Sequence, residues 1–384
     1  MAITVYLDTH HISRMASGKS QILRFVSDPA YSFVFSTSHV VECLPKEPRE
    51  NPGSIAQLNI ILNSQARWLV AWAKVASMEE SNPAVELNNL FCSKDQMLFS
   101  DFKIDRAEWT RRAREGLKEV LKSKIQDQNL RRSFQAKLLK HGKLTSEAFR
   151  IIKQQFQETF ERVSADLPHA LPLLSQGGLY EFLAGTVSEE EFRKVFMESL
   201  ADPIAFAMMC SDPDLASILD ISRFFWSQTD ELSEILSRLV VNVRNDYAQA
   251  GAPSYARGKV QIEQHLKREE FRSALVRKIA GVEVAAKDLV AMTGTRFFVD
   301  IFSQYVLEKL DRFANPASRD FMAAPSFKRS DVADFSHLFY YPYVDIFGCD
   351  GEMRNRIKKA GWPTEKVVAT DNELESKLIE ITPH

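Results

Sequence analysis

Acidic residues stand where short apolar segments end or helical segments begin, and carboxylates placed in this way are able to bind a metal ion. Asp8 and Asp350 each end an apolar segment, Glu42 lies within another, and Asp331 and Asp334 are three residues apart on a helical pattern. That spacing places the last two on one helix face. Because side chains beyond the carboxyl ends of parallel strands gather at one sheet edge, we expect the five acids in one cleft.

Carboxylates that share a cleft raise each other's pKa unless a cation neutralises them. Mg²⁺ and Mn²⁺ prefer carboxylate and water oxygens, and either ion can activate a water and stabilise charge on a phosphodiester. We therefore expect one or two such ions. The alternative for Asp8 and Asp331 is a structural role as a helix N-cap. His10 and His11 are expected to be structural or to face the substrate, because hard cations rarely recruit histidine.

The elements that must position these acids are predicted at both ends of the chain. β-branched and aromatic residues predict strands, and 3.6-residue periodicity predicts helices. The expected order is strand 3–7, helix 9–15, strand 31–35, helix 40–44, helix 54–75 and a short strand 75–78, then, near the other end, helix 329–340, strand 344–350, helix 351–360 and strand 366–370. Between them, residues 102–319 have helical periodicity almost throughout. Alternating strands and helices favour a parallel sheet.

Four of these segments, in order, resemble the motifs of the PIN-domain nucleases. They are Tyr6-Leu7-Asp8-Thr9, Ser36-Thr37-Ser38 with Val41-Glu42, Asp331 to Leu338 with the pattern Asp-x-x-His-Leu, and Asp345 to Asp350. The resemblance implies that the catalytic, metal-binding acids are Asp8, Glu42, Asp334 and Asp350. It implies Asp331 as a fifth ligand or as a partner of one, and it implies supporting roles for Thr9, Ser38 and His337. Cys349 departs from the family, which usually has Thr or Ser there.

The resemblance also implies the fold. We expect an α/β protein with a PIN-like three-layer core and a central parallel sheet, formed by residues 1–95 and 325–384. Residues 96–324 are expected to form an all-helical insertion that lies over or beside the cleft, and such an insertion is not a typical part of the family fold.

The activity that the resemblance implies is metal-dependent endoribonuclease cleavage of single-stranded RNA or tRNA, in the setting of a toxin or a defence effector. Two alternatives stay open. Related folds cut branched DNA, so the first is a structure-specific DNA nuclease. The second is a non-catalytic PIN-like scaffold or partner-binding module. A regulatory protein partner is expected, and homo-oligomerisation is left open.

A basic stretch, residues 106–143, is the predicted nucleic-acid contact. Its cations outnumber its acids, and Trp109 and Phe134 stand among them. One interpretation is an ordinary solvated helix face. The other is a surface that binds phosphates next to the cleft. The candidate contacts are Arg111, Arg112, Lys118, Arg131 and Arg132.

Composition excludes several other classes. The 384 residues are 45% hydrophobic and carry a formal net charge of −2, so bulk charge does not indicate a nucleic-acid binder and any basic surface must be local. The four cysteines are too far apart in sequence for a zinc knuckle or a redox pair. Sparse cysteines, and the lack of an apolar run of roughly 20 residues, predict a cytoplasmic protein without a membrane contact.

Overall fold

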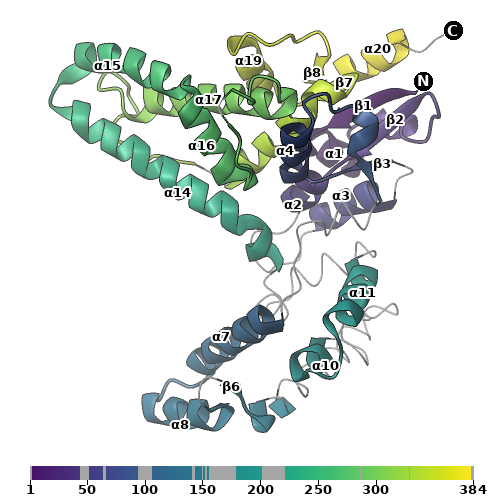
Figure 1. Cartoon of the computed structure of the whole chain (residues 1–384), viewed down its shortest axis with the longest axis vertical. Coiled ribbons are helices and arrows are strands. Elements are labelled where there is room, and N and C mark those ends of the chain that lie inside the picture. Colours follow the sequence, from purple (N-terminus) through teal and green to yellow (C-terminus); the bar gives the residue numbers. More distant parts are fainter. Residues whose placement is uncertain are drawn as a thin grey trace. The chain divides into compact units, whose positions relative to one another are not determined.

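The computed structural model of the chain describes residues 2–43, 52–63, 66–93, 106–140, 143–148, 150–151, 154, 179–200, 221–285, 287–327 and 329–381. By their internal contacts these residues divide into two compact units (Figure 1). The first, which we call the sheet unit, comprises residues 1–43, 63–101 and 225–384. The second, the helical unit, comprises residues 44–62 and 102–224.

A six-stranded sheet forms the centre of the sheet unit, with the strand order β4-β3-β2-β1-β7-β8. The strands are β1 (Ile3–Leu7), β2 (Tyr31–Phe35), β3 (Arg67–Leu69), β4 (Phe91–Cys92), β7 (Ile346–Gly348) and β8 (Val367–Val368). All neighbouring strands are parallel except β3 and β4. The α/β class, and a mostly parallel sheet to which both ends of the chain contribute, are thus confirmed.

The inner strand β1 is apolar on both faces and joins the two ends of the chain. Val5, Tyr6 and Leu7 are fully buried, as expected for a parallel strand that is covered on both faces. Leu7 lies beside Gly348 of β7, and the Asp8 N–H donates to the Gly348 carbonyl at 3.0 Å. A Cβ on Gly348 would lie 2.7 Å from Leu7 Cδ2, so glycine permits this close packing.

Helices make up the rest of the sheet unit. Those from its N-terminal parts are α1 (Thr9–Ala16), η1 (Ile22–Phe25), α2 (Thr37–Cys43), α4 (Trp72–Ser81) and α5 (Leu87–Leu90). Those from its later part are α14 (Ile221–Ala248) apart from its first four residues, α15 (Gly251–Leu266), α16 (Glu269–Ala280), α17 (Thr293–Phe313), α18 (Arg329–Ser336), η3 (His337–Tyr343), α19 (Gly351–Lys359) and α20 (Asp371–Ile381). More than half of α17 is buried, and this helix packs against α4, α16, α18, η3 and α19. Residues 225–324, which we expected within the insertion, therefore belong to the sheet unit by their contacts.

The helical unit has an aromatic core of its own. Its elements are α7 (Arg106–Lys124), α8 (Gln128–Leu138), α10 (Leu179–Ala184), α11 (Glu189–Leu200), the antiparallel pair β5 (Leu139–Lys140) and β6 (Lys143–Leu144), and all but the last residue of α3 (Pro52–Asn63). The rings of Phe182 and Phe192 are stacked with centroids 4.1 Å apart, and Trp109 meets both edge-on. Since Trp109 is buried in this core, it is not placed to stack on a nucleic-acid base.

Two predicted elements near residue 70 are wrong. The sequence predicts one helix over 54–75, whereas the structure has α3, then β3, then α4. Trp68 lies on β3 and Trp72 begins α4, so their one-turn spacing does not reflect one helix. β3 pairs with β2 and β4, and this pairing in the sheet outweighs the local helical pattern. The strand predicted at 75–78 is part of α4.

The other predicted elements at the two ends are found, with shifted limits. The strands at 3–7 and 31–35 have the predicted bounds, and the helix at 351–360 is one residue shorter. The helix predicted at 329–340 ends at Ser336 and continues as the 3-10 helix η3, which contains Pro342. Among the described helices, none combines the length and the apolar character that crossing a membrane requires.

Candidate functional site

The order in which strands are added to the sheet reverses at β1. From β1 the chain adds β2 and β3 on one side, whereas β7 and β8 lie on the other. A crevice forms beyond the carboxyl ends of the strands at such a point. Asp8 directly follows β1 and Asp350 closely follows β7, so the sheet places two of the predicted acids at this edge, on neighbouring strands.

Asp8 and Asp350 each cap the helix that follows them. The Asp8 carboxylate accepts from the His11 N–H at 3.4 Å, and the Asp350 carboxylate accepts from the Met353 N–H at 2.7 Å. The capping role that the sequence offered as the alternative for Asp8 is therefore present in the structure. Capping uses only part of the hydrogen-bonding capacity of each carboxylate, because a carboxylate offers about four acceptor positions. Each negative charge is also favoured by the positive end of a helix dipole.

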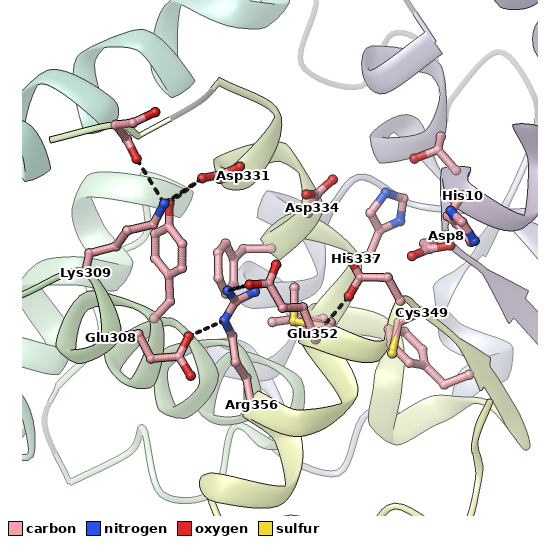
Figure 2. Close-up of a pocket in the computed structure, with 18 of the residues that line it drawn as sticks. Asp8, His10, Glu308, Lys309, Asp331, Asp334, His337, Cys349, Glu352 and Arg356 are labelled. Atoms are coloured by element: carbon pink, nitrogen blue, oxygen red, sulfur yellow. Dashed lines mark hydrogen bonds and ion pairs between the residues drawn. The ribbon is translucent and has the colours of Figure 1, made fainter. Parts of the chain in front are cut away.

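A cleft of about 430 Å³ opens at this edge (Figure 2). The ionisable residues that line it are the carboxylates Asp8, Glu308, Asp331, Asp334, Asp350 and Glu352 and the cations Lys309, Arg312 and Arg356, together with His10 and His337. In Figure 2, Asp8 and His10 lie on one side, Asp331 and Lys309 on the opposite side, and Asp334 between them. Carboxylates thus outnumber cations in the lining, which attracts positive charge into the cleft.

The predicted catalytic acids interact with one another electrostatically. Burial, followed by the charges of Asp334 and Asp350, raises the pKa of Asp8 to about 8. Burial raises the pKa of Asp334 well above its ordinary value, and Glu42, which hydrogen-bonds Asp334, raises it further. The Asp334 side chain is exposed to solvent, but the protein around it displaces much of the bulk water. This loss of water disfavours the charged carboxylate and so raises its pKa. Two carboxyl groups at hydrogen-bonding distance need a proton or a cation between them.

Glu42 stands behind the cleft, where it accepts a hydrogen bond from one predicted supporting residue and lies close to another. Its side chain is 6% exposed, and it is not among the residues that line the cleft. The Thr9 hydroxyl donates to Glu42 Oε2. His337 Nε2 lies 3.1 Å from Glu42 Oε1. Two of the three residues predicted to support the ligands, Thr9 and His337, are thus in contact with a predicted ligand.

A buried polar network continues from His337 into the sheet. The Tyr6 hydroxyl lies 2.7 Å from His337 Nδ1 and 2.9 Å from Ser36 Oγ. Burial lowers the pKa of His337 to about 3, so its ring is neutral at pH 7. Ser38, the third predicted supporting residue, is buried beside the Tyr6 hydroxyl.

His39 fixes the end of β1 relative to the start of α2, and the sequence analysis missed it. The Ser36 N–H donates to His39 Nδ1 at 3.0 Å, and His39 Nε2–H donates to the Leu7 carbonyl. Burial lowers the pKa of His39 well below its ordinary value, which keeps this neutral form. Its place beside the Ser-Thr-Ser segment, in a stretch of apolar residues, is a signal that the sequence contains.

Asp331 is engaged by residues of α17 on the far side of the cleft. The Tyr305 hydroxyl donates to Asp331 Oδ2 at 2.7 Å, and Lys309 Nζ donates to the same atom at 3.2 Å. The charge of Asp331 is therefore balanced by a lysine. Of the two roles that the resemblance implied, this arrangement favours a partner over a fifth ligand.

The cationic side of the cleft comes from α17 and α19, and the sequence analysis did not place it there. Arg356 Nε donates to Glu308 Oε2 at 2.8 Å, and Arg312 Nε donates to Asp320 at 2.7 Å. Tyr305, Lys309 and Arg312 occupy positions i, i+4 and i+7 of α17, which places them on one face of a largely apolar helix. This polar face was a usable signal, but we had assigned the segment to the insertion.

The remaining residues singled out near the acids have mainly structural partners. His11 is buried, with Nδ1 2.8 Å from Asp371 Oδ1, whereas His10 is exposed and lines the cleft. Cys349 is buried at the cleft wall, and the pKa of its thiol is raised by burial and by Asp8 and Asp350. Asp345 is exposed and accepts from the Thr4 N–H at 2.8 Å.

The predicted nucleic-acid contacts lie on α7 and α8 of the helical unit. Arg111 donates to both carboxylate oxygens of Glu115, at 2.8 and 2.9 Å. The side chain of Arg112 is outside the part of the structure that is described. Lys118, Arg131 and Arg132 line a second cavity together with Lys122.

The cleft fits a hard divalent cation in its chemistry and in its charge. Its acids supply oxygen ligands of the kind that Mg²⁺ and Mn²⁺ prefer. For Asp8 and Asp334, burial and then the neighbouring carboxylates raise the pKa, and a cation would offset both influences. Among the described residues, however, no three Asp, Glu, His or Cys side chains are close enough to form a ligand group in this conformation. Binding would require the carboxylates to move towards one ion.

Comparison of the chain with protein-family models, with curated proteins and with solved structures gives no match. The resemblance to PIN-domain nucleases therefore stays a prediction from the sequence.

Proposed function

We propose that the protein is a metal-dependent endoribonuclease with a PIN-like catalytic core. Asp8, Glu42, Asp334 and Asp350 would hold one or two Mg²⁺ or Mn²⁺ ions, and the substrate would be RNA. One observation carries the proposal. Four acids that are far apart in sequence form one electrostatically interacting group, and the sheet sets two of them at the point where its strand order reverses.

The parts of the site are suited to this task in different ways. Asp8 and Asp350 sit at helix N-termini, which fix their positions and favour their charge. Glu42 is oriented by Thr9 and lies against His337, an arrangement typical of residues that support metal ligands. When bound, the ion would activate a water and stabilise negative charge on the phosphodiester. Lys309, on the opposite wall, would face a substrate phosphate.

The test is a cleavage assay with Mn²⁺, with and without a chelator, on labelled single-stranded RNA, tRNA and branched DNA. We compare Asp350→Asn with Asp345→Asn, which makes the same change five residues earlier, outside the cleft. Asparagine is also a good N-cap, so Asp350→Asn preserves the start of α19. We expect chelator-sensitive RNA cleavage that falls at least roughly 100-fold in Asp350→Asn, because ligand loss exceeds the loss of a supporting partner. Asp345→Asn should cleave normally.

Each contrary outcome has a distinct meaning. Full metal-dependent activity in Asp350→Asn means that the site is assigned wrongly. Cleavage of branched DNA alone supports the structure-specific DNA nuclease. Absence of cleavage, together with no heat of Mn²⁺ binding and no thermal stabilisation by Mn²⁺, supports a non-catalytic scaffold, because a ligand that prefers the folded state raises its stability.

A further inference from the structure

A cavity of about 330 Å³ on the helical unit has no carboxylate among the described residues that line it. We call it the basic groove. It is lined by Lys118, Lys122, Gln128, Arg131, Arg132 and Gln135. Its lining residues come from α7 and α8, which contact each other.

The spacing of the lining residues shows that one face of α7 and one face of α8 form the groove. On α8 they occupy positions i, i+3, i+4 and i+7, which is the spacing of a single face. On α7 the two lysines are at i and i+4 and also share a face. Two helices in contact usually have apolar residues at such positions. Here each helix presents cations and amides to the same hollow.

The four cations of the groove have no acidic partner within the described part of the chain. No described carboxylate lies within ion-pair distance of Lys118, Lys122, Arg131 or Arg132. Elsewhere in the same unit, Arg111 pairs with Glu115 and Arg150 with Glu147. Like charges at i and i+4 are destabilising, and a concave surface concentrates their field. An anion bound in the groove would relieve this repulsion.

We propose that the basic groove binds the phosphate backbone of single-stranded RNA. Arg131 and Arg132 present planar guanidinium groups that match phosphate oxygens two at a time. Gln128 and Gln135 add amide donors of the kind that contact phosphates. The lining residues that the structure describes include no aromatic side chain, so recognition is of the backbone and independent of base sequence. The choice of RNA among phosphate polyanions rests on the function proposed above, whereas the anion preference rests on the groove alone.

The test measures binding without cleavage. Fluorescence anisotropy of a labelled 20-nucleotide single-stranded RNA is followed in the presence of a chelator, with the full-length chain, at several salt concentrations. The variants are Lys118→Gln with Lys122→Gln, and Arg131→Gln with Arg132→Gln. The matched control is Arg193→Gln with Lys194→Gln, which removes the same charge from exposed positions of α11 in the same unit.

We expect each groove variant to bind the RNA roughly tenfold more weakly, and the slope of log affinity against log salt to fall in magnitude by about 1.4, because each phosphate contact on a single strand contributes about 0.7. The control should bind like the unsubstituted chain. Arg131→Lys with Arg132→Lys should retain most of the binding, since the charge remains. Circular dichroism checks that α7 and α8 are intact in every variant.

Competitors identify the chemistry that the groove recognises. Unlabelled RNA and inorganic tripolyphosphate should both displace the labelled strand, with RNA effective at lower concentration. Equal displacement by polyglutamate of the same charge overturns the proposal, because it shows no preference for phosphate. Unchanged RNA binding in both groove variants overturns it as well. If the groove variants weaken binding but no cleavage of RNA is ever detected, the groove stands and the proposed nuclease activity fails.

Discussion

Asp8 is subject to two opposing influences, and their balance decides how the site behaves. The N-terminus of α1 favours a negative charge at this position. Burial and the neighbouring Asp334 and Asp350 oppose it, and the net result is a pKa raised to about 8. Without a cation, Asp8 is therefore largely protonated at pH 7. A divalent ion would displace that proton, so metal binding should strengthen as the pH rises.

The raised pKa of Asp8 also predicts how stability depends on pH. Its folded-state pKa is about 8, against an ordinary value of 3.8, so the stability that it contributes is full below about pH 4 and is lost as the pH rises to about 8. Asp8→Asn cannot ionise and keeps the cap. We expect the metal-free variant to gain stability over the unsubstituted chain as the pH rises from 5 to 8, reaching about 1–2 kcal/mol after allowing for water in the cleft.

Urea unfolding in the presence of a chelator, at a series of pH values, measures this difference directly. The comparison between the two proteins removes the contributions of all other titrating groups, provided that they are unchanged. A difference that stays constant from pH 5 to pH 9 would show that the Asp8 carboxyl is not coupled to Asp334 and Asp350 as described.

His337 is the residue through which the buried network reaches the acids. Its ring lies between the Tyr6 hydroxyl and Glu42, at 2.7 and 3.1 Å. His337→Phe preserves ring volume but removes both nitrogens, so Glu42 loses a partner. We expect Mn²⁺ to bind roughly tenfold more weakly, the lower end of the effect of losing such partners. Calorimetric titration with Mn²⁺ measures this, and His265→Ala, at an exposed residue of α15, is the control.

At the scale of elements, the placement of α17 depends on one buried carboxylate. Glu79 of α4 is fully buried and accepts from the Gly294 and Thr295 N–H groups at 2.6 and 2.9 Å. It also accepts from the Thr295 and Tyr343 hydroxyls. A side chain from a distant segment thus caps the N-terminus of α17. That helix in turn brings Lys309 and Glu308 to the cleft.

Glu79→Ala should therefore destabilise the sheet unit strongly. The change leaves several buried donors without an acceptor, and we expect a loss of about 3 kcal/mol in the free energy of unfolding. The control is Glu80→Ala, at the exposed neighbouring position, which should change stability by less than about 0.5 kcal/mol. Equal midpoints of urea unfolding for the two variants would contradict this account of α17.

Gly294 provides an independent check on the same junction. A Cβ at this position would lie 2.4 Å from the Phe339 carbonyl oxygen. The first turn of α17 is therefore so close to η3 that a side chain larger than that of glycine would clash. We expect Gly294→Ala to cost about 1–3 kcal/mol through overpacking, despite the better helix propensity of alanine. Urea unfolding measures the loss, and a stabilised variant would show that α17 and η3 are farther apart.

Local patterns were enough to predict the strands and helices that carry Asp8 and Asp350. β1 is a continuous apolar strand, and each aspartate directly precedes a helix, so strand end and N-cap are both visible in the sequence. β3 was missed because three residues leave no periodicity to detect, and its pairing with β2 is a property of the sheet. The hydrogen-bond partners of Glu79 could not be predicted from local patterns either, because they are more than 200 residues away in sequence.

At the scale of the whole molecule, helical periodicity could not show where one unit ends and the next begins. The pattern continues across residue 225, yet the described residues of α14 to α17 share a core with the sheet, whereas α7, α8, α10 and α11 are grouped in the helical unit by their contacts. The sequence pattern places Lys309 within residues 96–324 for this reason, and it does not predict that α17 lines the cleft. Amphipathic helices have the same pattern whichever partner they bury, so only the packing distinguishes the two units.

Because each unit has its own core, we expect scanning calorimetry of the full chain to show two transitions. Mn²⁺ should raise the transition temperature of the sheet unit, which contains the cleft.

Phe192→Ala removes a fully buried ring stacked on Phe182. It should lower the transition temperature of the helical unit, with a loss of about 3–5 kcal/mol in the free energy of unfolding. Phe134→Ala, at a ring that is 39% exposed in the same unit, is the control and should have little effect. One transition that responds both to Mn²⁺ and to Phe192→Ala would mean that the chain unfolds as a single cooperative body. The division into a sheet unit and a helical unit, and the separate functions that we propose for them, would then lose their physical basis.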